Sequence, residues 1–289
     1  MNPGKGGIQL RTIAVVNLKG GSGKTTVALS LAVGLARSLP KGRRLLIVDA
    51  DPQGNASLTM LQGKAPADPT LTDVLLGDSE AGEAIRPSRL PSIDIMPADA
   101  SLAECTVLLV EEMGRELKLR AALQSIEDKY DICIIDAPPQ MSLISINVMN
   151  AARELIVPVD PGIYSASGLG RLEETVQQVR KNLCHPELSI IGLILTKLMK
   201  NKAARDFERQ LREHYGPLVY AAAIPYSVRV EEACARHLTV LEYAPTSPAA
   251  AAFDRLIKEL ATHGKRTNGT AGRNHGSNRS AARKKRRAG

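Results

Sequence analysis

The sequence predicts a doubly wound, mainly parallel α/β sheet flanked by helices, and three observations support this fold class. Short aliphatic runs alternate with segments of helical periodicity, as in sheets whose parallel strands are joined by crossover helices. Hydrophobic residues make up 44% of the 289 positions but aromatic residues only 3%, so an aliphatic core buried on both faces of a sheet is expected. Segments rich in glycine, lysine or aspartate follow three of the runs, at the carboxyl edge where such sheets bind ligands.

Seven aliphatic runs are the expected strands. They comprise residues 13–16, 45–48, 93–96, 132–135, 155–159, 190–195 and 219–224. Helical patterns lie between most of these runs, and the main ones are residues 101–125, 142–152, 167–183, 202–214 and 248–262. Residues 62–91 are rich in proline, glycine and aspartate, and we expect them to form a surface excursion with one short helix.

The composition divides the chain into three parts. Residues 1–7 are glycine-rich and are expected to be flexible, residues 8–262 carry the α/β pattern, and residues 263–289 form a basic tail. The tail holds nine lysines and arginines and no acid, whereas the net charge of the whole chain is +8, so the remainder is near neutral. Because the tail contains no aliphatic residue larger than alanine, it is expected to be disordered. Its charge indicates a polyanionic partner such as nucleic acid.

The cysteines and the hydropathy exclude several classes of protein. Cys105, Cys133, Cys184 and Cys234 lie far apart, and no pair has the spacing typical of a zinc site or a disulfide framework. We expect them to be reduced thiols of a cytoplasmic protein. No apolar run approaches 18 residues, so a membrane span is not expected.

The segment after the first expected strand predicts a phosphate-binding loop. It consists of Lys19, Gly20, Gly21, Ser22, Gly23, Lys24, Thr25 and Thr26, and a helical pattern follows over residues 27–37. The glycines allow several backbone N–H groups to face one phosphate, and the helix N-terminus adds partial positive charge. In this pattern Lys24 reaches the β- and γ-phosphates, and the Thr25 hydroxyl ligates Mg²⁺. Lys19 is a second, unusual lysine at the position where the pattern has its first glycine.

Aspartates follow two further expected strands and complete a hydrolytic site. Asp136 comes directly after residues 132–135 and is expected to hold Mg²⁺ through water. Asp49 and Asp51 lie two positions apart, so both face one side of an extended chain. One of them could assist the metal while the other orients the attacking water, or both could serve a turn. Lys19 is the candidate cation for charge that develops on the transferred phosphoryl group.

These motifs together resemble the ParA family of partition ATPases, a branch of the deviant-Walker P-loop group that includes MinD. The resemblance covers residues 8–262. The matching stretches are residues 19–26 (Walker A), 49–55 (switch I), 130–139 (Walker B and switch II), 224–233 (nucleotide-base loop) and 243–248 (entry to the last helix).

The resemblance implies a role for each matching residue. Lys24 and Thr25 bind phosphate and Mg²⁺, and Asp136 is the Walker B acid. Lys19 is the signature lysine, which contacts the nucleotide of the partner subunit in an ATP-bound sandwich homodimer. In switch I, Asp51 supports the attack of water.

The remaining implied contacts concern the metal, the base and DNA. Asp49 lies nearer the metal than Asp51 does, and Pro225 borders the adenine. Family members bind DNA nonspecifically through basic residues of the C-terminal half. Arg229 matches one such position, and Lys200 and Lys202 are plausible additions.

The resemblance implies an Mg²⁺-dependent ATPase that switches a DNA-partition system. Its ATP dimer binds DNA and releases it after hydrolysis stimulated by a ParB-like, centromere-binding partner. The expected location is the cytoplasm, on the nucleoid. The basic tail is read either as an additional DNA-binding arm or as a solubilising tail.

Three other functions share the phosphate loop. A related ATPase that positions a protein cargo on the nucleoid would have the same chemistry throughout. A MinD-like membrane ATPase needs an amphipathic C-terminal helix, and residues 264–289 lack the apolar side chains for it. An iron–sulfur reductase needs a cluster cysteine after the Walker B strand, where residues 137–140 contain none.

Overall fold

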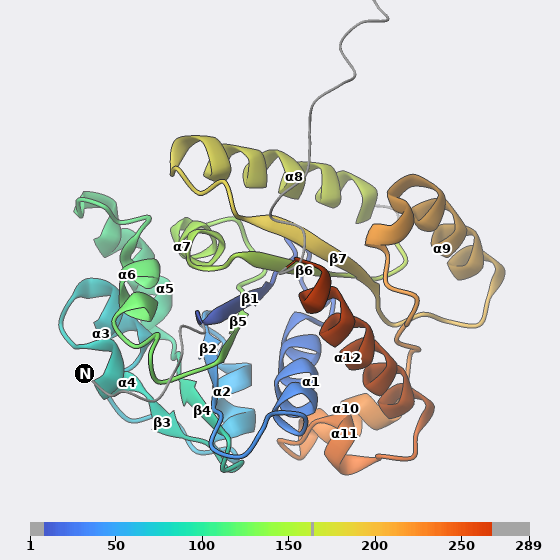
Figure 1. The fold of residues 1–289 in the computed structure, drawn as a ribbon, viewed down its shortest axis with the longest axis horizontal. Helices are drawn as coiled ribbons and strands as arrows, with labels where there is room; N and C mark the ends of the chain where they lie inside the picture. Colours follow the sequence, from blue (N-terminus) through green and yellow to red (C-terminus); the bar gives the residue numbers. More distant parts are fainter. Residues whose placement is uncertain (1–8, 163–164, 268–289) are drawn as a thin grey trace, which may run out of the picture.

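The computed structural model describes residues 9–162 and 165–267 and contains a seven-stranded sheet. The strands lie in the order β3-β4-β2-β5-β1-β6-β7, and every neighbouring pair is parallel except β3–β4 at one edge (Figure 1). Their bounds are β1 Arg11–Val15, β2 Leu45–Asp49, β3 Arg86–Pro87, β4 Ile93–Met96, β5 Ile132–Asp136, β6 Glu154–Val159 and β7 Ser189–Leu195. The predicted doubly wound, mainly parallel sheet is confirmed.

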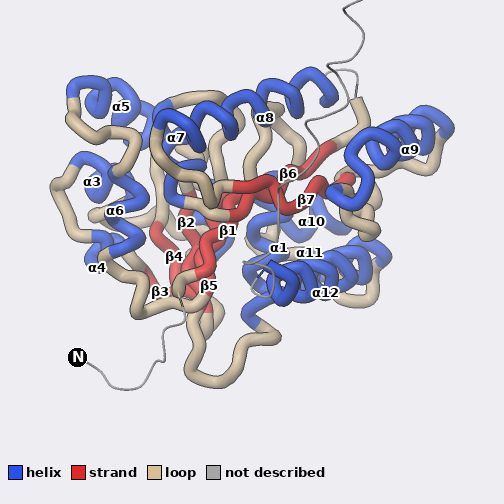
Figure 2. The backbone as a smooth tube through the Cα atoms, turned by 45° about the horizontal axis from the view of Figure 1, so that its top comes forward, coloured by secondary structure: helices blue, strands red, loops and turns tan. Residues whose placement is uncertain are grey.

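Helices cover both faces of the sheet (Figure 2). One face packs against α1 Lys24–Ala36, α2 Asn55–Met60, α10 Val228–Ala235, α11 Val240–Tyr243 and α12 Pro248–Thr267. The other face packs against α3 Leu71–Leu76, α4 Ala81–Ala84, α5 Ser101–Leu108, α6 Lys118–Gln124, α7 Leu143–Ala151, α8 Ser165–Asn182 and α9 Lys202–Tyr215. Two 3₁₀ turns, η1 Leu109–Glu111 and η2 Gly216–Leu218, complete the described chain.

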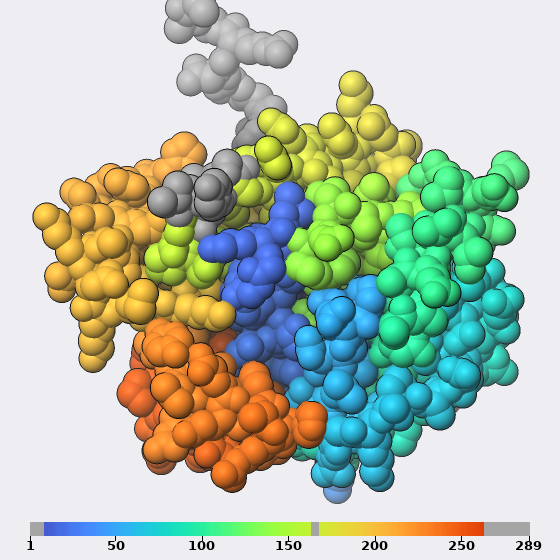
Figure 3. Space-filling view, turned by 180° about the vertical axis from the view of Figure 1, so that it is seen from behind, coloured from blue at the N-terminus to red at the C-terminus, as the bar shows by residue number. Residues whose placement is uncertain are grey.

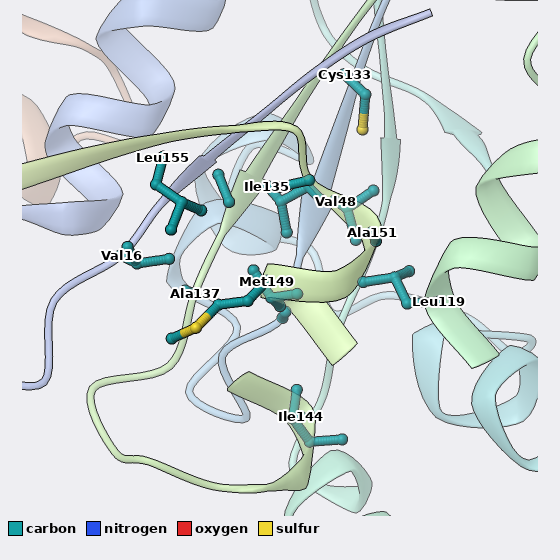
Figure 4. Close-up of a cluster of buried hydrophobic side chains, with 14 of the residues drawn as sticks. Val16, Val48, Leu119, Cys133, Ile135, Ala137, Ile144, Met149, Ala151 and Leu155 are labelled. Carbon is teal, nitrogen blue, oxygen red and sulfur yellow. The ribbon is translucent and has the colours of Figure 1, made fainter. Parts of the chain in front are cut away.

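The two cores arise because successive strand residues point to opposite faces. On β5, Cys133 and Ile135 join the cluster under α7, whereas Ile134 joins the cluster under α1. Figure 4 shows part of the first cluster, where Ile135 lies with Val48 near Met149 of α7. Burial on both faces explains why the central strands are continuous aliphatic runs rather than alternating patterns.

The crossover connections from the parallel neighbours β1 and β5 run in opposite directions along the sheet, to β2 and β6 respectively. The crossover from β1 uses α1 on one face, and the crossover from β5 uses α7 on the other. The carboxyl ends of these two strands therefore lie at a topological switch point, where open α/β sheets bind ligands. This geometry brings the loops after β1, β2 and β5 together.

A close approach of two helices supports this arrangement. At Gly34 of α1, an added Cβ atom would lie 1.9 Å from Cδ1 of Ile257 in α12, closer than any real contact. Glycine at this position allows α12 to lie directly against the helix that carries the phosphate loop.

One expected strand was wrong. Residues 219–224 run beside β7 but form only the isolated bridge between Leu193 and Val219. The Glu259 carboxylate of α12 accepts the backbone N–H groups of Ala221 (2.8 Å) and Ala222 (2.9 Å), which interrupts a ladder with β7. The seventh strand is instead β3, whose two residues give no periodic signal.

Two expected helical segments also differ. Residues 101–125 are not one helix, because the chain turns between η1 and α6. Buried Asn147 and Asn150 of α7 donate to the carbonyls of Arg115 (2.7 Å) and Glu116 (3.0 Å), and these bonds hold the turn. Residues 62–91 contain two short helices, α3 and α4, rather than one.

The last helix is longer than predicted. α12 continues to Thr267, five residues beyond the expected boundary at residue 262. The rest of the predicted tail and the expected flexible N-terminus at residues 1–7 lie outside the described residues. Within the described ranges, no helix combines the length and apolar character needed to cross a membrane.

Candidate functional site

The predicted phosphate loop joins the carboxyl end of β1 to the N-terminus of α1. Gly21 (φ 71°) and Gly23 (φ 88°) adopt left-handed backbone conformations that side-chain-bearing residues rarely tolerate. Gly20 lies exposed at the start of the turn, Ser22 is buried within it, and Thr25 and Thr26 lie in the first turn of α1. The loop therefore presents backbone N–H groups at a helix N-terminus, which is the geometry of an anion site.

Lys24 lies buried inside this loop. Its Nζ atom donates to the carbonyl of Lys19 at 3.2 Å. Burial lowers the pKa of the ammonium, and the nearby carboxylates of Asp136 and Asp51 oppose that shift. An ammonium that has lost much of its hydration can still gain from a phosphate group placed beside it.

Two aspartates meet at the ends of neighbouring strands. Asp49 of β2 lies opposite Asp136 of β5 in the sheet register, and both are fully buried. Burial raises the pKa of the Asp49 carboxyl to about 6, and hydrogen bonds from Ser57 and Asp51 oppose that rise. Asp49 Oδ2 accepts from the backbone N–H and the hydroxyl of Ser57, each at 2.7 Å. Asp49 thus fixes the start of α2.

Asp136 differs from Asp49 in its hydrogen bonding. Neither of its carboxylate oxygens, nor the hydroxyl of buried Ser22, has a hydrogen-bond partner of normal geometry among the described residues. Burial raises the pKa of Asp136 well above its usual range, the Asp49 charge adds to the rise, and the nearby Thr25 hydroxyl opposes it. Buried polar atoms are nearly always satisfied in folded proteins, so these atoms indicate a ligand.

The donor set around Asp136 fits magnesium bound with a nucleotide. Among the described residues, no group of three or more histidines, cysteines or acids is arranged to enclose a metal ion. Mg²⁺ keeps several of its waters and uses few protein ligands together with phosphate oxygens. A threonine hydroxyl beside one unsatisfied carboxylate meets that requirement.

Asp51 forms the turn that the sequence allowed as one of its two roles. Its Oδ1 atom accepts from the backbone N–H of Gln53 at 3.0 Å, and its carbonyl accepts from Gly54 at 2.9 Å. The side chain is 8% exposed and lies near enough to Lys24 to raise the pKa of that lysine. Asp51 therefore both forms a turn and lies near Lys24 of the phosphate loop.

Lys19 does not point toward Lys24. Its Nζ atom lies 2.8 Å from Oδ1 and 2.7 Å from Oδ2 of Asp160, which directly follows β6. Asp160 was missed from the sequence, although an acid after a predicted aliphatic strand is the signal that identified Asp49 and Asp136. Ser57 was also missed, because no sequence pattern marked it as a partner of Asp49.

Two cavities flank the phosphate loop and share Thr26, Val230 and Cys234. One, of about 340 Å³, is lined in part by Pro225 and by the loop after β7. The other, of about 320 Å³, extends between α1, α2 and α11. Figure 3 shows the molecule from behind the view of Figure 1. Dark-blue atoms near the N-terminus reach the surface there, between orange atoms of the C-terminal part and light-blue atoms of the segment that follows β2. Pro225 therefore lines a cavity that also reaches Gly23 and Thr26 of the phosphate loop.

The three residues expected at DNA are exposed and lie near the N-termini of α9 and α10. Lys200 lies in the loop before α9, Lys202 is the first residue of α9, and Arg229 lies in the first turn of α10. The segments that precede the two helices are joined by the hydrogen bond from Tyr226 N to the Leu198 carbonyl at 3.1 Å. Arg229 forms an ion pair with Glu232 at 2.7 Å, whereas no ion pair of the described residues involves either lysine.

Comparison with known proteins gives consistent matches. The family model described as "AAA domain" matches residues 10–190. The chain is 37% identical to the chromosome partitioning protein ParA of Caulobacter vibrioides over 254 residues, 87% of this chain and 94% of that protein. It is 34% identical to the sporulation initiation inhibitor protein Soj of Bacillus subtilis, over 88% of this chain and 99% of that protein.

A solved structure with bound ligands is also similar. A protein from Mycobacterium smegmatis named cobyrinic acid a,c-diamide synthase, with a bound ATP analogue and magnesium, aligns with a TM-score of 0.75 and 29% identity. The alignment covers 89% of this chain and 96% of the other. The phosphate loop, the paired strand-end acids and these matches lead to one assignment: the chain belongs to the ParA/Soj family of partition ATPases.

Proposed function

We propose that this ATPase is an ATP- and Mg²⁺-dependent switch that partitions DNA. The observation that carries the proposal is the fully buried Asp136, whose carboxylate has no hydrogen-bond partner of normal geometry beside a buried phosphate-loop lysine. Such a carboxylate is costly in the free protein, and a metal–nucleotide complex would satisfy it.

The chain's own residues divide the work of hydrolysis. Lys24 would contact the β- and γ-phosphates, while the Thr25 hydroxyl and, through water, Asp136 would hold Mg²⁺, with Asp49 nearby. Mg²⁺ neutralises charge on the phosphate oxygens when it is bound. Asp51 would orient a water molecule for attack on the terminal phosphorus, which breaks the bond to ADP and releases phosphate.

Two subunits would pair across their nucleotides. In this arrangement Lys19 contacts phosphate bound to the partner subunit, so ATP links the two chains and hydrolysis loosens them. The exposure of Gly20 and Gly21, next to a partly exposed Lys19, supports this role, because a second copy can reach this part of the loop.

Dimerisation would place two basic surfaces side by side on DNA. Lys200, Lys202 and Arg229 form one such surface in each subunit and would contact phosphates without reading sequence. The basic residues beyond Thr267 would add salt-sensitive affinity. A ParB-like partner bound at a centromere would stimulate hydrolysis, so the protein would reside in the cytoplasm on the nucleoid.

DNA retention across nucleotide states tests the proposal. We expect duplex DNA of arbitrary sequence to be retained with ATP and Mg²⁺ but not with ADP or without nucleotide. Lys19→Ala should lose ATP-dependent dimerisation and DNA retention, and Asp51→Ala should remain on DNA because ATP is not hydrolysed. Equal retention in all three nucleotide states would contradict the switch.

The contribution of the tail has its own test. A chain truncated after Thr267 keeps the whole of α12 and should retain basal ATPase activity. We expect its DNA affinity to fall and the dependence of affinity on salt concentration to become shallower, because fewer counterions are released. Unchanged affinity and salt dependence would leave the tail without a role in DNA binding.

A further inference from the structure

Lys19 and Asp160 form an ion pair that joins two neighbouring strands within one subunit. Lys19 follows β1 and Asp160 follows β6, and these strands are parallel neighbours in the sheet. The ammonium approaches both carboxylate oxygens, at 2.8 and 2.7 Å. The carboxylate is 18% exposed and the lysine side chain 37% exposed, so a sheltered acid holds a cation that reaches the surface.

A second set of contacts holds the same segment. The Asn17 side chain donates to the carbonyl of Pro158 in β6, and its Oδ1 atom accepts from the backbone N–H of Lys19 at 2.9 Å. The main chain before the phosphate loop is thereby fixed to the end of β6. The ion pair with Asp160 is therefore part of a built contact rather than a chance meeting of two flexible side chains.

We propose that Asp160 is a positioning residue that retains Lys19 within its own subunit and sets the protein concentration at which the ATP-dependent homodimer forms. The inference rests on the proposed function, in which Lys19 contacts the nucleotide of the partner subunit. An ammonium held by both oxygens of Asp160 must leave them to reach a phosphate across the dimer. Dimerisation exchanges a carboxylate for a phosphate at Lys19.

The exchange is favourable only with the triphosphate. A carboxylate carries one negative charge, and the terminal phosphate of ATP supplies more charge and three acceptor oxygens. ADP lacks that group, so Asp160 keeps Lys19 in the ADP-bound and nucleotide-free subunits. The two copies of the ion pair contribute together, and an effect of about threefold in each subunit becomes about tenfold in the dimer dissociation constant.

The test compares dimer dissociation constants by sedimentation equilibrium, with Mg²⁺ and either ATPγS or ADP as the probe nucleotide. Asp160→Asn removes the charge and keeps the shape of the side chain. We expect it to lower the dimer dissociation constant with ATPγS by about tenfold. It should leave the ADP-bound protein monomeric and nucleotide affinity under monomer conditions unchanged. Asp160→Glu, which keeps a carboxylate within reach of Lys19, should restore wild-type behaviour.

The same two strands supply a matched control. Arg11 and Glu154 pair at 2.7 Å at the amino ends of β1 and β6, with side-chain exposures of 25% and 17%. Glu154→Gln breaks a pair of similar geometry and burial far from the phosphate loop. We expect it to leave the dimer dissociation constant unchanged, so a general loosening of β6 is separated from the release of Lys19.

The outcomes distinguish this inference from the proposed function. If the wild type dimerises with ATPγS and Asp160→Asn does so no more readily, the role of Asp160 is wrong and the sandwich dimer stands. If neither protein dimerises with ATPγS, the sandwich dimer itself is wrong and the inference falls with it. An equal gain in Asp160→Asn and Glu154→Gln would also contradict the role of Asp160.

Discussion

Buried aspartates occur at the amino ends and at the carboxyl ends of the parallel strands, called here the amino edge and the carboxyl edge of the sheet. The aspartates at the two edges have different partners. At the amino edge, Asp94 accepts from the guanidinium of Arg44 and from the hydroxyl of Tyr130 at 2.8 Å. Asp131 pairs with Arg43 and accepts from the backbone N–H of Arg44 at 3.0 Å. Each of these acids has a cationic partner, and each connects strands that begin side by side.

At the carboxyl edge the acids face one another. Asp49 and Asp136 lie in register on adjacent strands, and burial raises the pKa of both carboxyls. The cation beside them is Lys24, whose pKa burial lowers. Only the amino-edge aspartates are each paired with an arginine in a direct contact.

The difference indicates that aspartates that stabilise the fold lie at the amino edge of the sheet, whereas aspartates available to a ligand lie at the carboxyl edge. A buried carboxylate with an arginine partner helps to hold the fold, because removal of either partner leaves a buried polar group unsatisfied. A buried carboxylate without such a partner costs free energy in the free protein and becomes favourable when a cation or a metal–nucleotide complex arrives. The predictions below test this contrast, from the largest expected effect to the smallest.

Lys24→Ala should have the largest effect on activity. Loss of the phosphate-loop cation should lower ATP turnover at least about 100-fold, because the charge that stabilises the transferred phosphoryl group is removed. The midpoint of thermal unfolding without nucleotide should not fall, since a buried ammonium is also removed. The matched change at the amino edge, Arg44→Ala, should lower the unfolding midpoint and leave turnover per folded molecule intact. Loss of stability in Lys24→Ala would contradict the contrast.

The free energy of unfolding should depend on pH through Asp49 at the carboxyl edge. The folded Asp49 carboxyl has a pKa of about 6, compared with an ordinary value of 3.8. The folded state therefore binds more protons than the unfolded state across this window, and the free energy of unfolding falls as the pH rises from about 4 to about 6. The expected loss is on the order of 1–3 kcal/mol.

Urea unfolding in EDTA across this pH window measures the effect. Asp49→Asn should make the slope of the unfolding free energy against pH shallower, because the titrating group is gone. Identical slopes in the wild type and Asp49→Asn would show that Asp49 does not titrate in this range.

Tyr130→Phe should have the smallest effect. It removes the hydroxyl that donates to Asp94 and leaves the Arg44 contact in place. We expect a loss of about 1 kcal/mol in the free energy of unfolding, with no change in the stabilisation produced by ATP and Mg²⁺. A change in the nucleotide effect would mean that the two edges of the sheet are coupled.

The sequence predicted the sheet well, because its central strands are aliphatic runs between helical patterns. It failed where long-range contacts decide the local structure. The carboxylate of Glu259 interrupts residues 219–224, and the amides of Asn147 and Asn150 hold the turn that divides residues 101–125. No local pattern reports a hydrogen bond from a helix that is distant in the chain.

The site was predictable in its parts but not in its pairings. The phosphate loop and the acids at the carboxyl ends of β2 and β5 followed from motif and strand position. The ion pair of Lys19 with Asp160 was not predicted, because the neighbours of β1 in the sheet were unknown from the sequence. The hydrogen bonds from Ser57 to Asp49 depend on how the chain turns after β2. The sequence did not decide whether Asp49 and Asp51 serve this turn or act on the metal and the attacking water.

Thermal unfolding of Asp136→Asn and Asp94→Asn, with and without ATP and Mg²⁺, tests the central claim most directly. Without nucleotide, Asp136→Asn should be as stable as the wild type or more stable, whereas Asp94→Asn should lose about 1–3 kcal/mol. With ATP at about 100 times its dissociation constant, the wild type and Asp94→Asn should gain about 2.7 kcal/mol, and Asp136→Asn should gain far less. A nucleotide-free Asp136→Asn that is destabilised yet keeps the full gain from ATP and Mg²⁺ would contradict the account.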